Sequence, residues 1–440
     1  MKRELKWAIA LLAIGLGNAD AANWLMLQGT ETSDARARLW GFIQPEYQST
    51  DGSALAAGPW AGQDAVFNLI GPDLDAESTF QLRRARLGVR GTAFPLDSRV
   101  NYFLLAEFGN NGITKLGGSR AARLTDASIT LNYLPGARIR IGQFKYPGAE
   151  EGLQAIHVFN YVNFTSITRQ QLLERFFDED GSRGGTGDGV ANAPNGAIGA
   201  FRDIGIQLFD TFKSGPWEHS YAVMVGNGNG IVRGDNDGNK DYYLYWSSEK
   251  VFGGKKARRQ GWKSFAWYQK GKRTLDYANG VAGEQTFDRT RWGLGTTYLK
   301  GKLRFAAEYM QADGMIFNGT DGGAVAGSLN NAGTAVASFN VLTDDSADGW
   351  YVDVGYRILP KLELDLRYDT LNRGTDVATR ERDFETWTIG LQWFFNKKAR
   401  LIANYEIRSA DAPGLPAGAA ANRILDGMDD RLSVQVLAVF

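Results

Sequence analysis

Hydrophobic and polar residues alternate along much of the chain, and residues 82–93, LRRARLGVRGTA, show the pattern clearly. Arg84, Arg86 and Arg90 share one parity, and the other parity carries alanine, leucine and valine. Successive side chains of a β-strand point to opposite faces, so we expect a strand with one apolar face and one cationic face. An edge strand of a soluble sheet gives the same pattern, and the rest of the chain decides between the two.

Sixteen segments alternate in this way, each with roughly the ten residues that a tilted transmembrane strand needs. The eighth and ninth, YYLYWSSE and WKSFAWYQK, are the weakest because either parity could face outward. The segments are 37–49, 79–93, 98–109, 124–134, 138–146, 201–211, 217–226, 241–251, 261–271, 289–299, 302–312, 349–358, 361–371, 385–395, 399–409 and 430–440.

The connections between these segments alternate in length. Short turns such as LPGA at 134 and LPK at 359 separate eight long loops. Outer-membrane barrels have short periplasmic turns and long extracellular loops, whereas a soluble sandwich has no reason to sort its loops by side. The alternation of short turns and long loops therefore predicts an all-β, antiparallel transmembrane barrel of sixteen strands. The long loops are 50–78, 110–123, 147–200, 227–240, 272–288, 313–348, 372–384 and 410–429.

Parity gives each predicted strand an outer and an inner face. Residues such as Ile129, Leu294 and Trp387 are expected to face lipid, with aromatic residues near the strand ends. The opposite parity is charged, as at Asp365 and Arg367. A charge at the lipid midplane costs a few kcal/mol, so this face must contact water. Sixteen strands leave space for an aqueous lumen, which the arginines of residues 82–93 are expected to line.

The two ends of the chain support export to the outer membrane. Basic residues precede an apolar run that ends at Leu16, and Ala19 and Ala21 follow in the spacing of a cleavage site. Residues 1–21 are therefore predicted to be a signal peptide. Residues 22–36 are expected to be an N-terminal periplasmic segment, and residues 37–440 the barrel. The last strand ends on Phe440, which resembles the assembly signal of bacterial outer-membrane barrels.

Composition narrows the possible classes of protein. The 49 basic and 49 acidic residues balance, so no nucleic-acid partner is expected, and the run KKARR at 255–259 falls on a periplasmic turn. The mean hydropathy of -0.30 and the absence of a long apolar stretch after the signal peptide exclude a helical membrane protein. The chain has no cysteine, which favours a closed sheet over disulfides.

The longest loop, 147–200, contains a candidate helix, TSITRQQLLERFF, with an apolar side that includes Ile167 and Leu172. We expect this loop to fold into the barrel and narrow the pore. A lid over the mouth of the barrel is the alternative.

Enzymatic and metal chemistry have little support in the sequence. The only histidines are His157 and His219, and His219 and its neighbour Ser220 would face opposite sides of a strand. The loop DNDGNKD at 235–241 offers alternating oxygen ligands but lacks the glutamate of a calcium loop. We expect no enzyme activity, no metal and no cofactor.

Several ordered strings resemble the phosphate-selective porin O and P family: FQLRRARLGVRG, LTDASITLNYLPGARIRIGQFKYPGAEEGL, ITRQQLLERFF, RDIGIQLF and YAVMVGNGNG. The resemblance is dense over residues 79–242 and continues to Phe440. It implies a homotrimer of sixteen-stranded barrels in the bacterial outer membrane. It also implies passage of small anions through a constriction lined by arginine and lysine.

The resemblance also identifies candidate binding residues in the pore. Its arginine pair corresponds to Arg83 and Arg84, although alternation alone turns Arg83 outward. It assigns Lys145 from the GQFK element and Arg169 from the third loop. Together with the inward parity, the predicted pore-lining set is Arg84, Arg86, Arg90, Arg140, Lys145, Arg169, Arg291 and Arg304.

Acidic residues share the predicted lumen, among them Glu107, Asp126, Glu308 and Asp353. This mixed wall departs from the cationic funnel of a strictly phosphate-selective channel. Three hypotheses therefore stay open: a channel with anion preference, a channel for other small organic or zwitterionic solutes, and a non-conducting surface barrel such as an adhesin.

Overall fold

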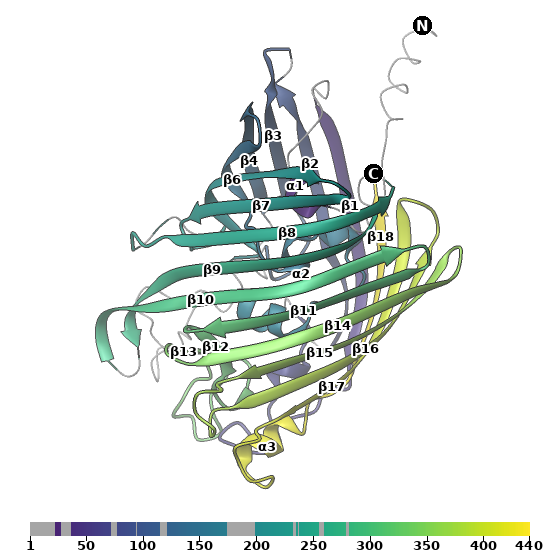
Figure 1. Cartoon of the computed structure of the whole chain (residues 1–440). Helices are drawn as coiled ribbons and strands as arrows, with labels where there is room; N and C mark the ends of the chain where they lie inside the picture. The colour runs from purple at the N-terminus through teal and green to yellow at the C-terminus, as the bar shows by residue number, and fades with distance from the viewer. Residues whose placement is uncertain are drawn as a thin grey trace, which may run out of the picture.

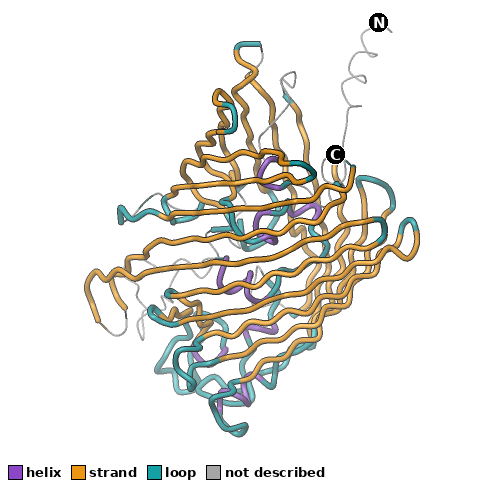
Figure 2. The backbone as a smooth tube through the Cα atoms, viewed as in Figure 1, coloured by secondary structure: helices purple, strands orange, loops and turns teal. Residues whose placement is uncertain are grey.

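The strands form one closed barrel in the computed structural model of the chain (Figure 1, Figure 2). The β1 and β18 strands, at the two ends of the chain, pair with each other, and every other neighbouring pair in the barrel is also antiparallel. The structure describes residues 23–27, 37–71, 77–93, 95–114, 121–173, 199–231, 235, 237–254, 259–278 and 281–440. The predicted signal peptide lies outside these residues, as do most of KKARR and the last part of loop 147–200.

The barrel contains sixteen of the described strands, which confirms the predicted fold. They are β1 (Arg38–Thr50), β2 (Ser78–Ala93), β3 (Asp97–Glu107), β4 (Arg123–Leu134), β5 (Ala137–Lys145), β6 (Arg202–Ser214), β7 (Trp217–Gly226), β8 (Asp241–Gly253), β9 (Gln260–Ala278), β10 (Val281–Lys300), β11 (Leu303–Asp313), β14 (Ser346–Leu359), β15 (Leu362–Arg373), β16 (Arg382–Phe394), β17 (Ala399–Asp411) and β18 (Arg431–Val439).

Short elements occupy the connections. The helices are α1 (Trp24–Leu27), α2 (Glu150–Leu153) and α3 (Ala420–Leu425), and a separate two-stranded sheet pairs β12 (Ile316–Thr320) with β13 (Phe339–Leu342). Single turns of 3-10 or π helix lie at Val66–Asn68, Ile156–Val158, Thr168–Leu172 and Asp321–Gly323. Among the described residues, no helix is long and apolar enough to cross a membrane.

The predicted long loop at 272–288 is wrong. Strands β9 and β10 continue through it and remain paired as far as Ala278 and Val281. The buried side chain of Leu275 packs against Met315, Phe317 and Phe339 of the neighbouring loop. This contact stabilises an extension well beyond the ten residues that a membrane-spanning strand requires.

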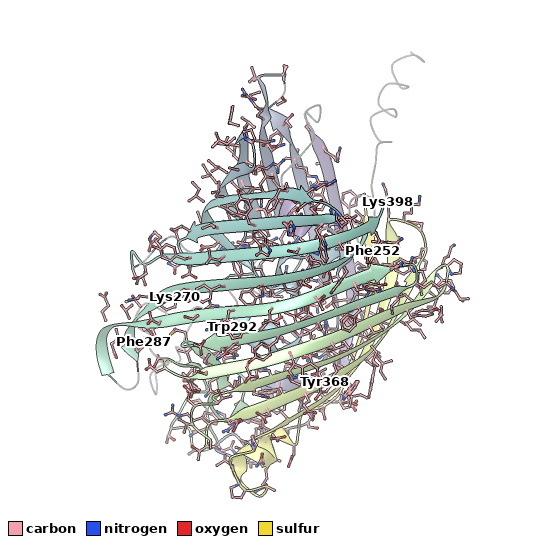
Figure 3. The ribbon with its side chains drawn as sticks, viewed as in Figure 1. Phe252, Lys270, Phe287, Trp292, Tyr368 and Lys398 are labelled. Carbon is pink, nitrogen blue, oxygen red and sulfur yellow. The ribbon has the colours of Figure 1, made fainter. Side chains whose placement is uncertain are left out.

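The two faces of the strands follow the predicted parity. Ile129, Leu294 and Trp387 are 49%, 54% and 46% exposed, whereas Asp365 and Arg367 are buried inside the barrel. Aromatic side chains such as Phe252, Trp292 and Tyr368 lie on the outer surface (Figure 3). The outside is therefore the hydrocarbon-facing surface, and the charged parity faces inward.

The barrel closes through a reciprocal backbone contact between its first and last strands. The Gly41 N–H donates to the Phe440 carbonyl at 3.1 Å, and the Phe440 N–H donates to the Gly41 carbonyl at 2.9 Å. A Cβ at position 41 would lie 2.5 Å from the Phe440 ring and 2.6 Å from the Arg86 carbonyl oxygen. The terminal aromatic ring therefore occupies the space that the missing side chain of Gly41 leaves.

Three long loops pack together at the end of the barrel opposite the C-terminus. Their apolar cluster joins Leu55 and Trp60 of the first loop to Ala324 of the sixth and Ile424 of α3. The Trp60 indole N–H donates to the Ser328 carbonyl at 3.0 Å, and Arg423 donates to the Ala56 carbonyl at 2.8 Å. The first, sixth and eighth long loops thus form one packed cap, which the sequence analysis did not predict.

We predict that Gly41→Val destabilises the folded barrel by about 1–3 kcal/mol, because the added methyl groups overlap the Phe440 ring and a backbone carbonyl. The free energy of unfolding in urea, followed by tryptophan fluorescence in detergent, measures this. Gly71→Val is the matched control, since a Cβ there meets no atom within 4 Å. Equal stability of the two variants would contradict the proposed role of Gly41.

Candidate functional site

A β-bulge in β2 turns two successive arginines into the lumen. Gln44 of β1 pairs with Arg84 and Pro45 pairs with Leu82, so Arg83 is the extra residue. Both arginines are buried, at 9% and 3% exposure. Proline cannot donate a ladder hydrogen bond and often marks a bulge, so Pro45 is a sequence signal that could have indicated this one. The bulge resolves the disagreement between simple alternation and the family resemblance over Arg83.

The arginine group of β2, which consists of Arg83, Arg84 and Arg86, has three different sets of partners. Arg83 donates to Glu46 at 3.3 Å, and Arg86 donates to Glu107 at 2.7 Å. Among the described residues, Arg84 donates to the side-chain oxygen of Gln44 alone, at 3.4 Å. No carboxylate in the described part of the chain forms an ion pair with it. Arg84 is therefore a deeply placed cation whose charge is compensated less directly than that of its neighbours.

Three further predicted residues lie inside the same side of the barrel. The Arg90 guanidinium lies 5.6 Å from the centre of the Trp40 ring. Arg140 lies 5.5 Å and 4.4 Å from the rings of Phe144 and Phe209. Lys145 donates to the Gly152 and Gln154 carbonyls at 2.7 and 2.5 Å, which fixes the start of the third loop.

The remaining predicted residues lie farther around the barrel. Arg169 is half-buried on the π-helical turn, and Arg291 donates to the backbone carbonyls of Gln171, Gly314 and Met315 at 2.9–3.1 Å. Arg304 forms ion pairs with three carboxylates: Asp353, Glu363 at 3.2 Å and Asp365 at 2.5 Å. The donors of Arg291 and Arg304 are thus directed at groups of the protein itself.

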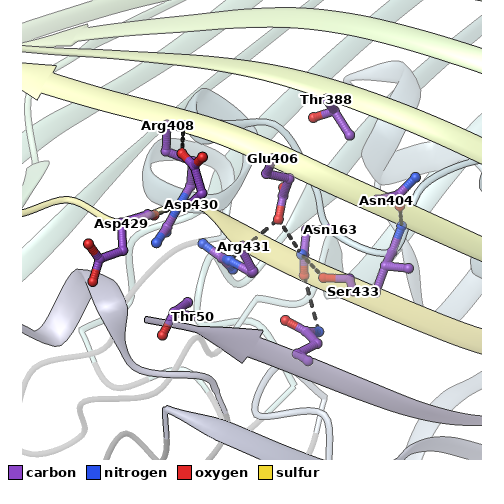
Figure 4. Close-up of polar contacts among 12 residues, drawn as sticks. Thr50, Asn163, Thr388, Asn404, Glu406, Arg408, Asp429, Asp430, Arg431 and Ser433 are labelled. Carbon is purple, nitrogen blue, oxygen red and sulfur yellow. Dashed lines mark hydrogen bonds and ion pairs between the residues drawn. The ribbon is translucent and has the colours of Figure 1, made fainter. Parts of the chain in front are cut away.

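The described part of the third loop, residues 147–173, crosses the inside of the barrel. Tyr161 donates to Asp353 at 2.7 Å, and the Ser166 N–H donates to Asp369 at 2.8 Å. Asn163 donates to Glu406 at 2.8 Å and to Ser433 at 3.2 Å (Figure 4). These contacts reach four separate strands. This stretch therefore lies within the barrel and does not form a lid over the mouth.

Two buried ionisable groups of this loop have shifted pKa values. Burial lowers the pKa of His157 to about 3, and nearby arginines, Arg400 first, act in the same direction. Burial raises the pKa of Glu151, against the opposing effect of Arg367. The imidazole of His157 is therefore neutral at physiological pH and adds no charge to the arginine side of the lumen.

Comparison with protein families identifies the chain. The sequence profile of the family described as phosphate-selective porin O and P matches residues 61–160 and 268–420. The chain belongs to this porin family. Family and fold together place the protein in the bacterial outer membrane as a channel-forming barrel. The matched ranges differ from the densest resemblance noted in the sequence, since residues 161–267 are outside them. Comparison with curated proteins found no match.

Several solved structures share the fold of this chain. The porin has a TM-score of 0.54 and 14% identity to OmpF of Salmonella typhi in complex with daunomycin, with 93% of this chain and 98% of that chain covered. The values for an anion-selective porin from Comamonas acidovorans are 0.52 and 14%, covering 92% and 100%. Those for the outer membrane channel DcaP of Acinetobacter baumannii are 0.50 and 15%, covering 94% and 100%.

The sequence analysis missed an apolar part of the porin's inner wall. The inward side chains of β6 to β9 include several large apolar groups, although parity predicted a polar lumen. Trp24 and Leu25 of α1 and residues of the third loop pack on this wall. The ambiguous segments YYLYWSSE and WKSFAWYQK could have indicated this apolar wall, because a strand covered on both faces has apolar residues on both parities. These inward residues are Phe209, Ala222, Met224, Tyr243, Tyr245, Phe265 and Trp267.

The residues that the sequence analysis examined for catalysis or metal binding do not come together in the structure. The centre of the His219 ring lies 5.8 Å from that of the outward Trp246 ring. Ser220 lies inside the barrel and donates a hydrogen bond to Thr211, so His219 and Ser220 do not form a catalytic pair. Asp235 accepts hydrogen bonds from backbone N–H groups and pairs with Lys240. In the described ranges, no group of three or more acidic or histidine side chains is arranged to hold a metal ion.

We predict that Arg304→Gln makes the porin more cation-selective, because three carboxylates on β14 and β15 lose their shared guanidinium. Removing one partner of a buried ion pair typically costs about 3 kcal/mol, so unfolding should also become easier. The reversal potential in a salt gradient and the urea midpoint measure the two effects. Adding Asp365→Asn to this variant should partly reverse both, and an additive loss would contradict the proposed charge balance.

Proposed function

We propose that this porin passes small hydrophilic solutes with a preference for anions, and that Arg84 is the central binding group. The observation that carries the proposal is the buried Arg84 guanidinium, which has one 3.4 Å hydrogen bond to Gln44 and no carboxylate ion pair within the described chain. Arg83 and Arg86 lie beside it on the same strand. An anion at this position would add the compensating charge that the wall does not supply.

The mechanism follows from the chemistry of guanidinium groups. The planar group offers several donors that match phosphate or carboxylate oxygens, and it stays charged at physiological pH. An anion can exchange its hydration shell for these donors in steps as it passes along β2. Glu46 and Glu107 moderate the neighbouring arginines, which keeps binding weak enough for release. Arg90 and Arg169 extend the cationic side of the lumen in this proposal. Arg140 and Lys145, whose donors bind backbone carbonyls, add positive potential without direct contact with solute.

The third loop sets the narrowest part of the pathway in this proposal. Residues 147–173 fill the lumen between the arginine side and the acidic strands, and Lys145 and Arg367 hold that stretch by bonds to the Gly152 and Asn163 carbonyls. An ion must pass between this loop and the wall. Arg291 and Arg304, whose donors already bind protein groups, have a supporting role in place of direct contact with solute.

One observation favours a second candidate, a channel for solutes that carry both charges. A cavity of about 60 Å³ lies beside the third loop, lined by Glu150, Glu151, Asp353, Arg304 and Tyr161 among others. Its mixed charges suit a zwitterion better than a simple anion. Current measurements with inorganic phosphate and with a neutral-pH zwitterionic amino acid as competing solutes separate the two candidates.

Family membership also supports proposals on maturation and assembly. We infer that residues 1–21 are removed as a signal peptide on export, and that the barrels associate as a homotrimer in outer-membrane lipid. No cofactor is required for passive conduction.

We predict that Arg84→Ala weakens anion binding in the channel roughly tenfold or more, because a hydrogen bond to a charged group contributes about 1.5–3 kcal/mol. In planar bilayers, the phosphate concentration at half-maximal current should rise by that factor. The reversal potential in a salt gradient should also move toward cations. Arg84→Lys, which keeps the charge but loses the fork of donors, should fall between.

Arg99→Ala is the control, since Arg99 lies exposed near a periplasmic turn and its partners within the described chain are Asp97 and the Tyr133 ring. Its conduction should match that of the unaltered protein. A cation-selective unaltered channel, or an Arg84→Ala channel identical to it, would overturn the proposal.

A further inference from the structure

A short N-terminal element lies inside the barrel, against the inner wall formed by β5 to β7. Trp24 and Leu25 of α1 are 4% and 2% exposed. Both belong to the apolar cluster that includes Phe209, Met224 and Phe265 on the inner wall. Residues 22–36 were expected in the periplasm, so burial of their described part within the lumen requires an explanation of its own.

Polar contacts tie this element to three different parts of the lumen. Asn23 donates to Ser220 at 2.7 Å and to Glu218 at 3.1 Å, both on β7. The Trp24 indole N–H donates to Glu150 of the third loop at 3.0 Å. Arg140 of β5 donates to the Leu25 carbonyl at 3.4 Å.

These contacts differ in kind from those that build the barrel. Each strand is held by a backbone ladder, whereas α1 is held by side-chain hydrogen bonds and by the fit of Trp24 and Leu25 on the wall. Removing α1 breaks no ladder. Glu150 would still pair with Lys263, at 2.6 Å, so the third loop would keep an anchor on β9.

We propose that α1 is an internal plug that determines both the width and the charge of the channel. Seated, it fills the lumen beside β5 to β7 and covers Arg140. Displaced, it uncovers that guanidinium to water between the Phe144 and Phe209 rings. The wider channel then has one more accessible cation on its wall. The selectivity part of this inference rests on the proposed anion preference, whereas the width part does not.

The absence of cysteine in the chain makes the plug testable by a reversible bond. The double variant Asn23→Cys/Ser220→Cys places two thiols where a 2.7 Å hydrogen bond now joins the side chains. Oxidation should lock α1 in place, and a thiol count confirms the bond. Single-channel conductance and reversal potential are then recorded in KCl before and after reduction.

Trp24→Ala is the complementary variant, which weakens the packing of α1 against the inner wall and introduces no crosslink. We expect the locked channel to stay at one low conductance level. The reduced channel should also visit a higher level, and Trp24→Ala should occupy that level most of the time, with conductance raised about twofold or more. At the higher level the reversal potential should move toward anions. The single variants Asn23→Cys and Ser220→Cys control for the substitutions.

Heat-modifiable migration on gels confirms that each variant is folded. Equal conductance of the locked channel, the reduced channel and Trp24→Ala would overturn the plug. A change in conductance without a change in selectivity would retain the plug and overturn the role of Arg140. If Arg84→Ala had no effect on selectivity, the anion preference would fail, and the conductance comparison would still decide whether α1 is a plug.

Discussion

The structure depends on the requirement that every backbone N–H and C=O within the hydrocarbon layer finds a partner in the protein. A closed sheet satisfies this requirement because it has no edge, and here the last pairing joins β1 to β18 through Gly41 and Phe440. Closure also fixes the two environments of each strand. One parity must be apolar, and the other is free to carry charge. The charged interior is thus a consequence of how the backbone is satisfied.

Charge inside the barrel is controlled mainly by pairing. Most inward arginines face a carboxylate or a backbone carbonyl, as Arg86 faces Glu107 and Arg304 faces three acids. Such groups hold strands and loops in register and present little net field to a passing ion. The anion binding that we propose relies on an exception to this pairing. That exception is Arg84, which has no ion pair among the described residues, because the bulge brings two guanidinium groups toward one acid, Glu46.

Much of the fold was predictable from the sequence, because alternation and loop length are local properties. All sixteen segments correspond to barrel strands, and the inward parity of Arg84, Arg140 and Arg304 follows from the same rule. What the pattern could not give was contact between segments far apart in the chain. The partners of Arg304, the seat of α1 under the third loop and the extension of β9 and β10 all depend on such contacts. The bulge at Arg83 was partly predictable, since Pro45 could have indicated an irregular pairing but not which residue it would turn inward.

The packed cap of the first, sixth and eighth long loops has a consequence for recognition at the cell surface. Its apolar residues come from sequence positions as far apart as Leu55 and Ile424, and its polar bonds cross between loops. A surface of this kind exists only when the three loops are folded together. Antibodies or receptor-binding proteins of phages that bind it would therefore recognise a conformational epitope, and a peptide copied from one loop would not reproduce it.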